Sequence, residues 1–240
     1  MAIELPGEVV SLLSFVGINW PTVNEDKVRE FASHVREFAQ NVESAHRDST
    51  ATVQQLGEAY QGASYEALLA KWSALSDSHF DELVQACHVV ATALDLAAEV
   101  IVGMKVETIA ELVVLAAALI ADQAAAVATF GLAEAAVIAI EEAAKRLINY
   151  LEQQLEQYVI GQVIEAAIDP LVEVVAGAVA GLVFGAAESA LGVQGGSSGT
   201  GFRIDPDALE AHARTMHDHA ETVAGHAQAF QSKIAGVSFE

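Results

Sequence analysis

The sequence has few basic side chains: 11 Lys and Arg stand against 33 Asp and Glu in 240 residues, so the formal net charge is −22. Nucleic acids and anionic lipids are bound by basic surfaces, which argues against a polyanionic partner. Hydrophobic residues nevertheless make up 53% of the chain, too many for a disordered acidic tail. The composition therefore predicts a folded protein of one large or two small domains.

Reactive groups are also scarce. The single Cys87 excludes an internal disulfide and a cysteine zinc site. His34, His46, His79 and His88 stand singly, with no Ser, Cys or acid placed to complete a nucleophile and base pair. The Gly-rich stretch 195–199 lacks the following Lys-Ser/Thr of a phosphate loop. We therefore expect no catalytic site, no cofactor and no metal ion.

Four further histidines lie near the C-terminus: His212, His217, His219 and His226. Three of them are spaced by seven residues, which at about 1.5 Å of helical rise per residue puts neighbours roughly 10 Å apart, too far to share a metal ion. A solvated helix edge is the simplest interpretation. The alternative is a pH-sensitive contact, in which protonation near pH 6 changes how this helix pairs with acidic neighbours.

Long apolar runs are missing. The charge-free stretches Leu112–Ala121, Gln123–Ala133 and Val174–Ala187 all fall short of the roughly 18 to 20 residues that span a bilayer. Glu4 and Glu8 stand where a Sec signal peptide carries basic residues. Buried helices are the expected outcome. The alternative is a membrane-active protein whose residues 100–191 insert after export, with Gly177, Gly181 and Gly185 allowing close helix contact.

Proline is rare and no segment alternates like a strand, so the fold class is expected to be all-α. After Pro21, the segment Thr22–Glu25 fits a capping box and predicts a helix start. Apolar residues then recur at steps of three and four, the pattern of a helix that packs lengthwise on a neighbour. This expected partner-binding face consists of Val28, Phe31, Val35, Phe38 and Val42.

This first helix should run to Ala59, where Tyr60-Gln61-Gly62 forms a short turn. A second helix follows from Tyr65, and two long helices joined by so short a turn must run antiparallel. Residues 89–191 are almost continuously apolar, which predicts helices that are buried on most sides or against a partner.

Ile168-Asp169-Pro170 is expected to end one helix and begin another. The sequence then predicts a helical domain over residues 1–191, a Gly/Ser linker over 192–202 and a C-terminal amphipathic helix within 203–240. Asp205-Pro206 is a typical helix start. The helix has nothing local to pack on, so it must dock on the body, self-associate or meet another chain. Its apolar face includes Leu209, Met216, Val223 and Phe230.

The hairpin with an aromatic-x-Gly turn resembles the WXG family that type VII (ESX) systems secrete, with Tyr60-Gln61-Gly62 where that family has Trp-x-Gly. The resemblance extends over residues 20–96. The longer chain looks like the WXG-like N-terminal leader of large actinobacterial secreted toxins, and residues 203–234 are similar to a small type VII substrate whose helix opens with Asp-Pro.

The resemblance implies an elongated helical bundle and a non-enzymatic module that directs a toxin or effector to type VII secretion. It also implies small helical partner proteins, contact with the secretion machinery and Sec-independent export from the cytoplasm; homo-oligomers and membrane contact remain open. Tyr60, Gln61, Gly62 and Trp72 would form the hairpin end that bears the secretion determinant. No Tyr is followed four residues later by Asp or Glu, the usual export motif of such hairpins, and long-toxin leaders often take that motif from a separate partner.

Overall fold

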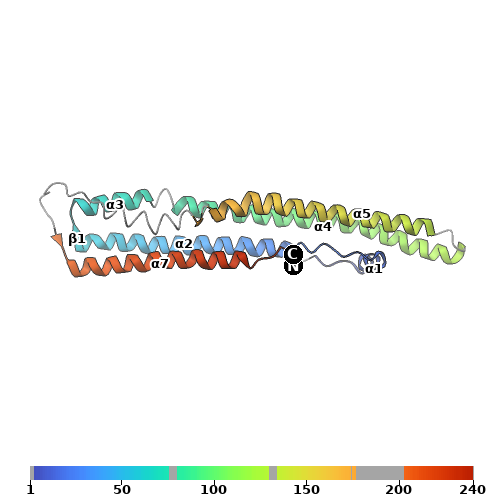
Figure 1. The fold of residues 1–240 in the computed structure, drawn as a ribbon, viewed down its shortest axis with the longest axis horizontal. Coiled ribbons are helices and arrows are strands. Elements are labelled where there is room, and N and C mark those ends of the chain that lie inside the picture. Colours follow the sequence, from blue (N-terminus) through green and yellow to red (C-terminus); the bar gives the residue numbers. More distant parts are fainter. Residues whose placement is uncertain (1–2, 76–79, 130–133, 174, 177–202, 240) are drawn as a thin grey trace. The chain divides into compact units, whose positions relative to one another are not determined.

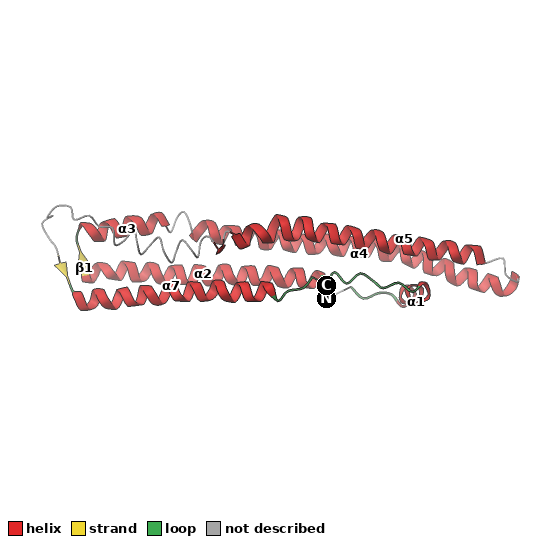
Figure 2. Cartoon of the chain, viewed as in Figure 1, coloured by secondary structure: helices red, strands yellow, loops and turns green. Residues whose placement is uncertain are grey.

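The computed structural model describes residues 3–75, 80–129, 134–173, 175–176 and 203–239, and helices make up most of them (Figure 2). The expected all-α class is confirmed. The elements are α1 (Gly7–Val16), α2 (Glu25–Ala59), β1 (Tyr60–Gln61), α3 (Ala63–Leu75), α4 (Asp81–Thr129), α5 (Glu134–Tyr158), the π-helix η2 (Val159–Ile168), β2 (Arg203–Ile204) and α7 (Pro206–Ala235). The predicted linker 192–202 and the glycine row 177–185 lie outside the described residues.

The chain divides into two compact units, and each is built from distant parts of the sequence. Unit 1 comprises residues 1–30, 93–167 and 238–240. Unit 2 comprises residues 31–92 and 168–237. Helices α2 and α4 each contribute residues to both units.

Unit 1 is built on the long helices α4 and α5, which lie side by side, with the short helix α1 against them (Figure 1). Pro6 precedes α1, and Gly17 ends it in a left-handed conformation with φ of 74°. The core of unit 1 joins apolar residues three, four or seven apart on each helix, the spacing that keeps one helical face buried. It contains Val9, Leu12 and Leu13 of α1, Leu112, Ala116 and Leu119 of α4, and Ile140, Ala144 and Ile148 of α5.

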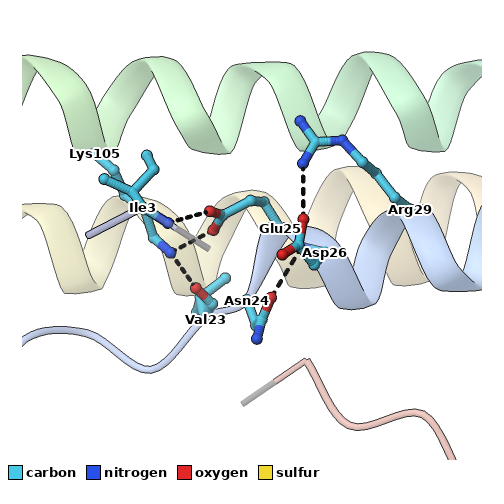
Figure 3. Close-up of polar contacts among 7 residues, drawn as sticks. All are labelled: Ile3, Val23, Asn24, Glu25, Asp26, Arg29 and Lys105. Atoms are coloured by element: carbon cyan, nitrogen blue, oxygen red, sulfur yellow. Dashed lines mark hydrogen bonds and ion pairs between the residues drawn. The ribbon is translucent and has the colours of Figure 1, made fainter. Parts of the chain in front are cut away.

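A buried ion pair joins the start of α2 to α4 within unit 1 (Figure 3). Lys105 Nζ lies 2.6 Å from Glu25 Oε2 and donates a second hydrogen bond to the carbonyl oxygen of Val23. The other carboxylate oxygen of Glu25 accepts from the backbone N–H of Ile3 at 3.1 Å. The side chains are 5% and 0% exposed, so each charge has exchanged water for these partners.

This environment makes unit 1 sensitive to acid. Burial raises the pKa of Glu25, but the hydrogen bond and charge of Lys105, with two backbone hydrogen bonds, outweigh it, so the pKa lies below its ordinary value. A carboxylate whose pKa is lower in the folded state stabilises that state fully above its unfolded-state pKa, near 4.5. The contribution is then lost as the pH falls through the lower, folded-state pKa.

We therefore expect that unit 1 of Glu25→Gln loses less stability than the parent as the pH falls below 5, because the glutamine side chain takes up no proton in this range. Trp20 packs against the core of unit 1, so its fluorescence in a Trp72→Phe background reports urea unfolding of this unit. Glu8→Gln, at an exposed position of α1, is the matched control and should leave the pH dependence unchanged. Identical acid profiles for Glu25→Gln and the parent would contradict the assignment.

Unit 2 contains the predicted antiparallel hairpin of α2 and α3. Tyr65 near the start of α3 donates hydrogen bonds to the carbonyl oxygens of Val53 and Gln54, at 3.2 Å each. Further along, Trp72 Nε1 donates to Thr50 Oγ1 at 3.0 Å. Residues later in α3 contact residues earlier in α2, which establishes that the two helices run antiparallel.

Helix α7 lies along α2 in unit 2 (Figure 1). The rings of Phe230 and Phe38 stack with centroids 4.7 Å apart, and Lys233 Nζ lies 2.6 Å from Glu37 Oε1. This hydrogen bond lowers the pKa of Glu37. Thr52 Oγ1 lies 3.0 Å from His219 Nε2. Of the three possibilities for the C-terminal helix, the structure shows docking on the body of the chain.

One local expectation was wrong and a second was confirmed. The residue that caps α2 is Asn24, not Thr22: its side-chain oxygen accepts from the backbone N–H of Asp26 at 2.9 Å, and the buried ion pair holds Glu25 instead of a capping box. The expected joint at Ile168-Asp169-Pro170 is present: the π-helix η2 ends at Ile168, and residues 169–173 form an α-helical segment that begins just before the proline, where the missing N–H of Pro170 costs little.

Over the residues that the structure describes, no helix is both long and apolar enough to cross a membrane.

Candidate functional site

The aromatic-x-Gly turn lies at the end of the hairpin in unit 2. Gly62 has a φ of 151°, a conformation that favours glycine, and α3 begins directly after it. Tyr60 and Gln61 form β1, which pairs antiparallel with β2, placing Tyr60 opposite Ile204 and Gln61 opposite Arg203. The backbone N–H of Asp205 donates to the carbonyl oxygen of Ala59 at 2.8 Å. The residues that precede α7 are thus hydrogen-bonded to the backbone of the turn.

Gly62→Ala should destabilise unit 2 by about 1–3 kcal/mol, since a residue with a Cβ rarely adopts this backbone conformation. Gly225→Ala is the matched control, because Gly225 lies in helix α7 and a Cβ there would meet nothing within 4 Å. This control should stabilise the helix by about 0.5–1 kcal/mol. Urea unfolding read from Trp72 fluorescence in a Trp20→Phe background measures both, and equal effects would contradict the prediction.

Behind the turn, tyrosine and tryptophan side chains fasten α3 to α2. Tyr65 approaches α2 so closely that a Cβ on Gly57 would lie 2.5 Å from its hydroxyl oxygen. Glycine at position 57 is therefore what lets this ring reach the backbone carbonyls of α2. The rings of His46 and Trp72 have centroids 5.7 Å apart, and those of His46 and Phe80 lie 4.3 Å apart. Trp72 thus belongs to an aromatic cluster of the hairpin, partly open to solvent.

The residues expected to form a partner-binding face on α2 are all buried within the chain. Val28 lies in unit 1, and the others lie in unit 2, where Phe38 stacks on Phe230 of α7. The most exposed of Val28, Phe31, Val35, Phe38 and Val42 is only 2% accessible. In this conformation the helices of the chain itself cover the face, so its assignment to a separate partner stays a prediction.

The predicted face of α7 is also used internally, but unevenly. Val223 and Phe230 are buried, whereas Leu209 and Met216 are half-buried. The half-buried pair lies in the N-terminal half of α7, which follows β2 directly. Burial therefore increases from the hairpin turn toward the C-terminal end of the helix.

The tail histidines do not form one cluster. His219 contacts Thr52 of α2, while His217 Nε2 lies 3.4 Å from Glu221 on the exposed side of α7. Among the described residues, no three His, Cys, Asp or Glu side chains are grouped to hold a metal ion. Burial raises the pKa of Cys87 to about 11, so its thiol stays protonated at neutral pH and is a poor nucleophile.

Sequence reasoning missed the contact between β2 and the turn, and the Lys105 to Glu25 pair. The helix start at Asp205-Pro206 gave an indication of the contact between β2 and the turn. If α7 starts there and docks on another element, Arg203 and Ile204 stand before it as an extended segment beside that element. The ion pair of Lys105 with Glu25 was indicated by a single Lys in an apolar stretch that has almost no other basic residue. Such a cation is costly to bury without an acidic partner.

The model of the WXG100 like domain matches residues 2–147, more than half of the chain. The matched range includes α1 to α4, the Tyr60–Gly62 turn and the first half of α5, and it excludes β2 and α7. No curated protein and no solved structure matches the chain.

Proposed function

Since the chain belongs to the WXG100-like domain family, a group of helical proteins associated with type VII secretion, we propose that it is a non-enzymatic leader module that directs a toxin or effector to that pathway. In this proposal the protein is made in the cytoplasm, pairs with small helical partner proteins and leaves by a Sec-independent route. The sequence resembles the leaders of actinobacterial secreted toxins, and this resemblance supports the toxin or effector part of the proposal.

The observation that carries the proposal is the position of Tyr60-Gln61-Gly62. It forms the tight connection of an antiparallel helical hairpin, as the resemblance requires, and the family match spans the whole hairpin. Gln61 is exposed, and Tyr60 is partly exposed. Side chains at the end of a hairpin that remain accessible can be read by a secretion machinery without unfolding the helices.

Export of the chain from a bacterium with a type VII system tests the proposal. Tyr60→Ala with Gln61→Ala should reduce the exported fraction strongly while helix content stays unchanged. Tyr150→Ala, which removes a tyrosine 66% exposed on α5, is the matched control and should be exported normally. Equal export of all three chains, or export from a strain that lacks the system, contradicts the proposal.

Partner pairing is tested separately by light scattering of the chain after co-expression with small helical proteins encoded beside its gene. A complex of defined stoichiometry is the expected result. A chain that stays monomeric with every neighbour would contradict the pairing, while leaving the export result to stand on its own.

A further inference from the structure

Helix α4 in unit 1 carries apolar residues on two opposite sides. The inner side is buried against the rest of the chain and contains residues that recur at steps of three and four. These are Leu94, Ala98, Ile101, Lys105, Thr108, Leu112, Ala116 and Leu119. The only charge among them, Lys105, is neutralised by Glu25. A single packed face of this kind accounts for the position of α4 in unit 1.

The opposite side repeats the same spacing and is exposed. We define the outer face of α4 as Leu96, Val100, Gly103, Glu107, Ala110, Val114 and Ala117, whose steps are again four and three. Leu96 is 57% exposed, Val100 41% and Val114 67%. This spacing is the one that helices use to pack lengthwise on another helix. The described fold leaves this outer face exposed.

Glu107 stands alone as a charge within the outer face. The other exposed charges of α4 between residues 93 and 121 are Glu99 and Glu111 at its edges, and neither Lys nor Arg is exposed in this stretch. A second copy of the chain would place acidic residues against these, which costs free energy. Insertion of this face into lipid would carry the Glu107 carboxylate into the hydrocarbon region, below the cationic groups of the lipid heads, which is costly.

We propose that the outer face of α4 docks an amphipathic helix of another protein, one that carries an apolar stripe interrupted by a Lys or Arg opposite Glu107. A charged residue within an otherwise apolar helix seam fixes register and partner choice, because only an opposite charge at the matching position satisfies it. The small side chains at Gly103, Ala110 and Ala117 let the incoming helix approach closely. This inference rests on the proposed pairing with helical partners and names the surface and the chemistry of the occupant.

Two synthetic helical peptides of about four heptads serve as probes. Both carry Leu at the stripe positions and neutral residues elsewhere, and they differ at one central stripe position, which is Lys in the basic probe and Glu in the acidic probe. Fluorescence anisotropy with the full chain should show the basic probe binding about tenfold more tightly, the ratio that corresponds to one favourable charge contact.

Glu107→Lys should reverse the preference between the two probes. Glu99→Lys changes the net charge equally but lies at the edge of the outer face, so the preference should keep its direction; a reversal there would show non-specific attraction instead. Val100→Asp with Val114→Asp should abolish binding of both probes. Ile138→Asp, at a position 52% exposed on α5, is the matched control and should bind the basic probe as the parent does. Circular dichroism verifies that every variant stays helical.

Three results would overturn the proposal. The first is that neither probe binds. The second is a dimer of the chain alone that Val100→Asp with Val114→Asp dissociates, which assigns the face to a second copy. The third is flotation with zwitterionic vesicles that the same double variant abolishes, which assigns it to lipid. Export is measured on the same variants: binding without export contradicts only the proposed function, and export without binding contradicts only this surface.

Discussion

Lys105→Met is expected to destabilise unit 1 by about 3–5 kcal/mol, the cost of leaving one member of a buried ion pair without its partner. The methionine fills similar space, but the Glu25 carboxylate stays buried without its cation and keeps only backbone hydrogen bonds, such as that from the N–H of Ile3. The carbonyl oxygen of Val23 also loses its donor. Urea unfolding followed by Trp20 fluorescence, in a Trp72→Phe background, measures the change.

Lys145→Met provides the matched control. Lys145 pairs with Glu141 one helical turn away on α5, at 3.9 Å, and its side chain is 49% exposed. Pairs of this kind contribute about 0.3–0.5 kcal/mol, so the control should shift the urea midpoint only slightly. The double variant Lys105→Met with Glu25→Met should recover most of the loss, because two apolar side chains leave no charge buried. A small effect of Lys105→Met alone would contradict the argument.

Phe230→Ala is expected to release α7 from α2, with a cost to unit 2 of about 3–5 kcal/mol, the usual range for a buried phenylalanine. Phe230 is 3% exposed and its ring stacks on Phe38. Without it, the contact between these helices loses its largest apolar side chain on α7. Hydrogen exchange measured by mass spectrometry should show faster exchange throughout residues 206–235, and little change in α5.

Phe15→Ala is the control for the loss of the same side chain from a different environment. Phe15 lies on α1 and is 50% exposed, so its removal leaves no cavity and should leave hydrogen exchange in α7 unchanged. If Phe230→Ala leaves exchange in α7 at the parent rate, the stacked pair does not hold the helix. In that case the ion pair of Lys233 with Glu37 and the β1–β2 contact would carry the docking.

Most helix ends could be predicted because local residues determine them. The end of α2 at Ala59 and the start of α7 at Pro206 follow from a glycine turn and an N-cap followed by proline. The cap of α2 was assigned to the wrong residue because Thr22 and Asn24 are both good caps two positions apart. Choosing between them depends on Lys105, which draws Glu25 away from the helix end.

Contacts between distant segments could not be predicted in the same way. The spacing of Phe31, Val35 and Phe38 correctly indicates a helix that packs lengthwise on a neighbour, but any helix with a matching apolar stripe satisfies it. That α7 of the same chain covers part of α2 depends on some 190 intervening residues, as the separation of Glu37 and Lys233 illustrates. For the same reason, the sequence alone left open whether the candidate partner face was occupied.

The attachment of α7 at both of its ends has a consequence for competition. Asp205 bonds to Ala59 before the helix begins, and the carbonyl oxygen of Phe239 accepts from Asn24 after it ends, at 2.8 Å in each case. Because α7 also belongs to the same chain, it has an effective concentration on the order of millimolar at its own binding site. A free helix with equal affinity for the same side of α2 would therefore have to be present at millimolar concentration to replace it. At lower concentrations, a partner helix can replace α7 on this side of α2 only if its intrinsic affinity for α2 is far higher than that of α7.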